Sequence, residues 1–207
     1  MCRGGRRTTE RHARETVLIV CEGQATERNY FDRLRREETV TDRLSVTVRS
    51  AHGGSPEAIV REAILYKEQY GEQGDDFGRV FCVIDVERDR SSLARARKLA
   101  QDGDIELVLS NPSFEVWLLA HYERSSRPFT GAKEVRAAFN RHWVKHHGRK
   151  YHKGDEDIYG RLARLRRTAI ANAKHVRERN FGGMADTADA NSSTEVYRLV
   201  EYLVGSS

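Results

Sequence analysis

Short apolar runs alternate with amphipathic stretches through the first 120 residues of the chain. The short runs are rich in β-branched side chains, as in buried strands, and they are predicted as strands at 17–21, 44–49, 80–84 and 105–109. Between them apolar residues recur at helical spacing, which predicts helices at about 26–38, 56–70 and 91–102 and a fourth from Glu115. Strands that alternate with helices favour an α/β fold with a parallel sheet of about four strands, flanked by helices.

Strand signals stop after Tyr122. Helices are predicted beyond that point at about 132–146, at 157–179 and after a cap at Ser193 or Thr194. The first residues are polar, rich in arginine and without periodicity, which predicts a flexible basic arm. The expected organisation is an arm at 1–15, an α/β domain at 16–123 and a basic helical extension packed on it at 124–207.

The composition limits the classes of protein to which the chain can belong. The chain has 207 residues, enough for a real core, and no run of 18 apolar residues, so no membrane contact is expected. The N-terminus has no apolar stretch after its basic residues, so we expect no secretion signal. Three cysteines without Cys-x-x-Cys spacing favour a reducing cytoplasm over a disulfide framework.

The net charge of +5 is unevenly distributed along the chain. Residues 124–179 carry 16 Lys and Arg against five acids, whereas the chain outside this segment and outside residues 1–16 holds 15 bases and 24 acids. An acidic centre that binds cations, beside a basic surface that binds phosphates, is what a metal-dependent nuclease needs. Solvated helix faces without a partner explain the same counts equally well.

Carboxylates follow three of the predicted strands. Glu22 comes after the first strand, Asp85, Glu87 and Asp89 after the third, and Glu115 just after the fourth. Ligands in open α/β sheets bind beyond the carboxyl ends of the strands, and alternate residues of extended chain project the same way, so Asp85 and Glu87 can meet one metal ion. Oxygen ligands favour Mg²⁺ or Mn²⁺. Acids in these places also serve as helix caps, which is the structural alternative.

The Glu22-Gly23 and Asp85-x-Glu87 elements resemble those of Toprim domains, in which the second element is usually Asp-x-Asp. Glu87 lengthens that arm, which leaves Asp89 as a substitute ligand. Over roughly residues 16–204 the chain also resembles the RloB family. The stretches that carry this resemblance are Val20-Cys-Glu-Gly-Gln-Ala-Thr-Glu27 with Tyr30-Phe31, Ser110-Asn-Pro-Ser-Phe-Glu-Val-Trp-Leu-Leu-Ala-His121, Tyr151-His-Lys153 with Asp157-Ile-Tyr159, and Ser193-Thr-Glu-Val-Tyr-Arg-Leu-Val200.

The resemblance implies a Toprim-type nuclease that acts in bacterial phage defence (abortive infection), beside an ABC, SMC-like or AAA-type ATPase encoded nearby. It implies catalytic acids at Glu22, Asp85, Glu87 and Glu115, with Mg²⁺ or Mn²⁺ held by Glu22, Asp85, Glu87 and Asp89. DNA and transfer RNA both stay open as substrates, and a homodimer is one option for its assembly. The alternative is a non-catalytic module that binds nucleic acid or a partner protein and whose acids are structural.

Contacts to nucleic acid are expected from the basic half and from one loop of the α/β domain. The candidates are Lys150, Lys153, His52, Arg166 and Arg167. The His52–Ser55 loop fits either a phosphate cradle or a helix-capping turn, and Lys150 and Lys153 fit either a phosphate grip or a solvated loop. Trp143, amid basic residues, is the candidate for stacking on a base.

Overall fold

A computed structural model describes residues 14–52, 54–74, 76–86, 90–181 and 186–205 of the chain. Residues 1–13 of the predicted arm lie outside the described residues, as do the candidate ligands Glu87 and Asp89. Glu15, the last residue of the predicted arm, already belongs to the first strand.

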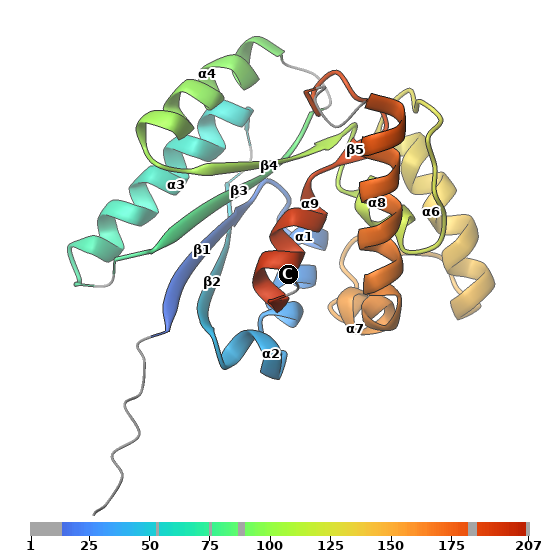
Figure 1. Cartoon of the computed structure of the whole chain (residues 1–207), viewed down its shortest axis with the longest axis horizontal. Helices are drawn as coiled ribbons and strands as arrows, with labels where there is room; N and C mark the ends of the chain where they lie inside the picture. Colours follow the sequence, from blue (N-terminus) through green and yellow to red (C-terminus); the bar gives the residue numbers. More distant parts are fainter. Residues whose placement is uncertain (1–13, 53, 75, 87–89, 182–185, 206–207) are drawn as a thin grey trace, which may run out of the picture.

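A five-stranded sheet in the order β2-β1-β3-β4-β5 forms the centre of the fold (Figure 1). The strands are β1 Glu15–Cys21, β2 Leu44–Ser50, β3 Arg79–Asp85, β4 Glu106–Asn111 and β5 Ser193–Thr194. The first four are parallel, and β5 pairs antiparallel with β4. Helices cover β1 and β3 on both faces, which is why their sequences are nearly continuous apolar runs. The predicted α/β class is confirmed, with one strand more than expected.

Helices pack on both faces of this sheet (Figure 1). They are α1 Thr26–Leu34, α2 Glu38–Thr41, α3 Pro56–Gly71, α4 Arg90–Asp102, α5 Glu115–Ala120, α6 Ala132–His147, α7 Ile158–Leu162, α8 Arg166–Phe181 and α9 Val196–Val204, with a 3₁₀ turn at Ala163–Leu165. The α3 and α4 helices cover one face, and the others lie on the opposite side. The His52–Ser55 loop ends in the predicted cap, because Ser55 Oγ accepts the N–H of Ala58 at 3.4 Å and Pro56 opens α3.

Three predicted elements differ from the structure. The helix expected at 26–38 ends at Leu34, and the short α2 follows. The helix expected at 157–179 is divided into α7, the 3₁₀ turn and α8. Its apolar positions continue through the turn, so periodicity alone does not reveal the break. The expected cap residues Ser193 and Thr194 form β5 instead. A strand of two residues is too short to show the alternation of apolar and polar residues by which strands are predicted, so the sequence did not reveal it.

The predicted helical extension shares its core with the sheet. One hydrophobic cluster combines Val17 and Ile19 of β1 with Trp117 of α5, Phe139 of α6 and Leu199 of α9, all at most 1% exposed. Burial of such side chains is the main favourable contribution to folding. Residues on both sides of the predicted boundary at 123 therefore stabilise each other.

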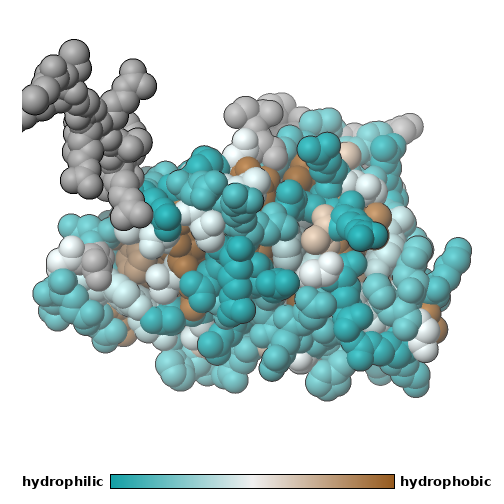
Figure 2. All heavy atoms as spheres, turned by 90° about the horizontal axis from the view of Figure 1, so that it is seen from below, coloured by the Kyte–Doolittle hydropathy of each residue, from teal (hydrophilic) through white to brown (hydrophobic). Residues whose placement is uncertain are grey.

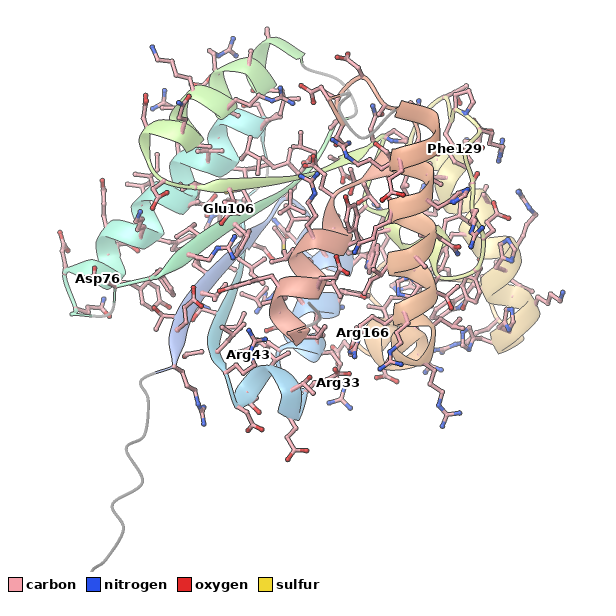
Figure 3. The ribbon with its side chains drawn as sticks, in the orientation of Figure 1. Arg33, Arg43, Asp76, Glu106, Phe129 and Arg166 are labelled. Carbon is pink, nitrogen blue, oxygen red and sulfur yellow. The ribbon has the colours of Figure 1, made fainter. Side chains whose placement is uncertain are left out.

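The α9 helix lies against β4 and α8 and is fixed at its end by Arg43 (Figures 1 and 3). The Arg43 guanidinium donates to the carbonyls of Tyr202 and Leu203 at 3.4 and 3.5 Å. The Tyr202 ring packs on Phe81 of β3 with 5.6 Å between the ring centroids. These contacts hold the end of the described chain against the middle of the sheet.

The face of the molecule seen in Figure 2 is mostly hydrophilic. Figure 2 shows one face on which polar side chains surround small apolar areas. Within the described ranges, none of the helices combines the length and the apolar character that crossing a membrane requires.

Candidate acidic site at the carboxyl edge of the sheet

Three of the predicted acids meet at the carboxyl ends of neighbouring strands. Glu22 follows β1, Asp85 ends β3, and Glu115 opens α5 after β4. Two hydrogen bonds connect these strand ends: the N–H of Asp85 donates to Glu22 Oε2 at 2.9 Å, and the N–H of Phe114, the residue before Glu115, donates to Asp85 Oδ1 at 2.8 Å. The sheet topology thus brings together acids that are far apart in the sequence.

A fourth carboxylate, Glu27, belongs to the same group. It lies in the first turn of α1 and is only 8% exposed. Its carboxylate folds back over Gly23, where a Cβ atom would come within 1.9 Å of Glu27 Oε2, so the close approach requires glycine. Sequence reasoning missed this role, although Glu27 stands five residues after Glu22 in the first turn of the helix that follows the strand.

Burial, and then mutual repulsion, raises the pKa values of two acids in the site. Burial, together with repulsion from Glu115 and Glu22, raises the pKa of Glu27 from 4.5 to about 7, against the opposing effect of Lys153. Burial and the charges of Glu27, Glu22 and Glu115 raise the pKa of Asp85 well above its ordinary value. The acids therefore favour a nearby cation.

The donor chemistry of the site fits Mg²⁺ or Mn²⁺. All four side chains offer carboxylate oxygens, and Glu115 Oε1 is buried without a hydrogen-bond partner. Among the described residues, however, no three His, Cys, Asp or Glu side chains are arranged so that they could hold a metal ion. The described side chains thus have the donor chemistry of a Mg²⁺ or Mn²⁺ site without the arrangement of one.

Lys153 extends from the basic half of the chain to this site. Its Nζ lies 3.4 Å from Glu115 Oε1, and its own carbonyl accepts a hydrogen bond from Thr26 Oγ1 at 2.9 Å. The Tyr151 hydroxyl lies 2.8 Å from the same Thr26 Oγ1. The loop after α6 is thereby fixed to the start of α1, next to Glu27.

The other predicted nucleic-acid contacts are exposed residues or bond to groups other than the four acids. Lys150 and Arg167 are exposed, on the loop after α6 and on α8. His52 is also exposed and pairs with Glu62. Arg166, at the start of α8 (Figure 3), bonds to Glu37 and to the Tyr159 hydroxyl.

The expectation that Trp143 stacks on a base is wrong. Its side chain is 0% exposed and packs between the rings of Phe139, His147 and Tyr151. The basic residues near it in sequence lie on the outer face of α6, whereas the indole points into the core, as large apolar side chains on amphipathic helices do.

An open, mostly parallel α/β sheet with acids gathered beyond its strand ends defines a class of α/β proteins whose ligand site lies at that edge. Within this class the chain belongs to the RloB-like family: the family model of RloB-like proteins matches residues 17–203. The match includes the four acids and Lys153. No curated protein and no solved structure matches the chain.

Proposed function

We propose that this RloB-like protein is a metal-dependent nuclease that hydrolyses phosphodiester bonds of DNA or RNA, as the effector of a bacterial anti-phage system with an ATPase partner. The observation that carries the proposal is the convergence of Glu22, Glu27, Asp85 and Glu115 at the carboxyl edge of the sheet, with Lys153 beside them. The resemblance of the Glu22-Gly23 and Asp85-x-Glu87 elements to Toprim domains supports it.

Four acids have assigned roles in this proposal. Asp85 and Glu87 hold the ion, and Glu22 completes the ligand set or accepts the proton of the attacking water. The acids would hold Mg²⁺ or Mn²⁺, which when bound would supply the positive charge that activates water and offsets the charge on the phosphodiester. The raised pKa of Glu27 suits it to exchange a proton near neutral pH.

The basic half supplies the substrate surface in this proposal. The side chain of Lys153 is 54% exposed, so its ammonium reaches the acids while it still faces solvent and an approaching phosphate. Lys150 and Arg167 provide exposed charge on the same half of the chain. Contacts of this kind make binding sensitive to salt, for DNA and RNA alike.

A cleavage assay tests the proposal. The purified chain is incubated with plasmid DNA and with total transfer RNA, in Mg²⁺, in Mn²⁺ and in EDTA, alone and with the ATPase encoded beside it. Cleavage of either substrate is expected in metal, and Asp85→Asn is expected to lower it by at least about 100-fold, as for removal of a key catalytic group. Asp42→Asn, at an exposed aspartate, is the matched control.

The result that contradicts the proposal is equally definite. No cleavage under any of these conditions, or full activity of a folded Asp85→Asn variant, overturns it.

A non-catalytic binding module is the second candidate. It is favoured by the hydrogen bonds that Glu22 and Asp85 accept from backbone N–H groups, since such bonds also suit purely structural acids. Nucleic-acid binding that persists in EDTA, without cleavage in Mg²⁺ or Mn²⁺, distinguishes this candidate from a nuclease.

A further inference from the structure

The loop that follows α6 is held to that helix before it reaches Lys153. Gly148 ends α6 in the left-handed region, at φ 67°. The Tyr151 N–H then donates to Asn140 Oδ1 at 2.8 Å, and the Tyr151 ring packs edge-on against Phe139 with 4.9 Å between the ring centroids. The chain therefore turns back along α6, and the helix fixes the position of Tyr151.

Thr26 holds the same loop from the other side. Its hydroxyl has a single hydrogen, which it donates to the Lys153 carbonyl at 2.9 Å, so it accepts from the Tyr151 hydroxyl at 2.8 Å. Thr26 is 3% exposed and is the first residue of α1, directly before Glu27. A buried hydroxyl thus joins the backbone of Lys153 to the helix that carries one acid of the site.

The Lys153 side chain extends from this fixed backbone to the acids. Its Nζ lies 3.4 Å from Glu115 Oε1, and its side chain is 54% exposed whereas that of Glu115 is 3% exposed. The ammonium therefore contacts both the buried acid and the solvent. A phosphate that approaches the acids is repelled by their negative charge, and a positive charge between the two offsets that repulsion.

We propose that Thr26 and Tyr151 are positioning residues, which hold the Lys153 ammonium where it binds a backbone phosphate of the nucleic acid at the acidic site. The inference rests on the proposed function, because it assigns a substrate contact to that site, but it does not depend on a bound ion. A lysine side chain loses much conformational freedom when it binds, and a backbone fixed in advance limits the cost to that side chain. DNA and RNA both supply the phosphodiester.

The experiment measures binding to the full-length chain by fluorescence anisotropy, in EDTA and over a series of salt concentrations. The probes are a labelled DNA duplex and a labelled transfer RNA. Lys153→Met is expected to raise the Kd about tenfold at low salt and to lower the slope of log Kd against log salt by about 1. Lys153→Arg keeps the charge and should bind as the wild type does. Lys98→Met, which removes an equal charge at an exposed position of α4, is the matched control and should also leave the Kd unchanged.

A double-mutant cycle tests the positioning residues. Thr26→Val and Tyr151→Phe keep the lysine charge but remove the hydroxyls that hold its backbone, so each should raise the Kd about threefold. In the Lys153→Met chain the same changes should leave the Kd unchanged, because they act through the lysine. Thr26→Ser keeps the hydroxyl and should bind as the wild type does. Circular dichroism confirms that each variant is folded.

The outcomes separate this inference from the nuclease proposal. An unchanged Kd and salt slope in a folded Lys153→Met chain overturn the phosphate contact, and equal effects of Thr26→Val with and without Lys153 overturn the positioning role. The expected changes with either probe support the inference and identify the source of the phosphate. The same changes without cleavage in Mg²⁺ or Mn²⁺ support the inference and count against the nuclease. A wild-type chain that binds neither probe overturns the inference, even if it cleaves nucleic acid in metal.

Discussion

Replacing Glu27 by Gln should make the protein more stable at neutral and alkaline pH. The pKa of Glu27 is about 7 in the folded protein and 4.5 as its ordinary value, mainly because burial disfavours the charged form. A difference of about 2.5 units corresponds to about 3 kcal/mol of unfolding free energy. Glutamine keeps the size of the side chain and carries no charge, so the variant avoids this cost.

The pH dependence fixes the sign of the effect. Between pH 4.5 and about 7 the folded protein keeps the Glu27 proton while the unfolded chain loses it, so wild-type stability falls, relative to the variant, as pH rises. The advantage of Glu27→Gln is expected to grow from about 1 kcal/mol at pH 5.5 to about 3 kcal/mol at pH 8.5.

Urea unfolding in EDTA at four pH values between 5.5 and 8.5 measures this difference. Glu156→Gln, at an exposed position just before α7, is the matched control and should stay within about 0.5 kcal/mol of wild type throughout. A Glu27→Gln variant that is less stable than wild type at pH 8.5, or an advantage that does not change with pH, would refute the reasoning.

Three further predictions concern buried groups. Burial lowers the pKa of His121 to about 4, so below pH 6.5 the unfolded chain binds more protons than the folded protein. The free energy of unfolding should therefore fall by about 3 kcal/mol between pH 6.5 and 4. His121→Gln should weaken this pH dependence in urea unfolding, and an unchanged dependence of the unfolding free energy on pH contradicts the prediction. Trp143→Ala should cost about 3–5 kcal/mol in the same assay because the indole is fully buried, and a loss below about 1 kcal/mol contradicts the packing. Gly23→Ala should lower the free energy of unfolding by about 1–3 kcal/mol, because the added Cβ clashes with the Glu27 carboxylate. In a double-mutant cycle, Glu27→Ala in the same chain should restore most of that lost free energy. If the free-energy changes of the two single variants simply add in the double variant, the clash is contradicted.

The sequence predicts the sheet and three residues of the acidic site. The runs that became β1 and β3 are buried on both faces, so their composition alone marked them as strands. The sequence predicted that Glu22, Asp85 and Glu115 lie close together, because parallel strands place their carboxyl ends at one edge of the sheet.

Other parts of the site depend on tertiary contacts that leave no local pattern. An acid in the first turn of a helix usually interacts with the helix dipole, so nothing at Glu27 itself revealed that it folds over Gly23. The place of Lys153 follows from a loop that returns to Thr26 across 127 residues of sequence. Trp143 was misassigned because its sequence neighbours are basic, whereas the direction of a helical side chain depends on what the helix packs against.

The β5–α9 segment has a consequence for biosynthesis. Glu195, between the two elements, exchanges hydrogen bonds with Leu109 of β4: its N–H donates to the Leu109 carbonyl at 2.8 Å, and its Oε2 accepts the Leu109 N–H at 3.1 Å. A nascent chain that has not yet released residues 193–204 from the ribosome lacks these bonds and the apolar cover of α9. During translation the sheet therefore stays partly uncovered until residues 193–204 have left the ribosome.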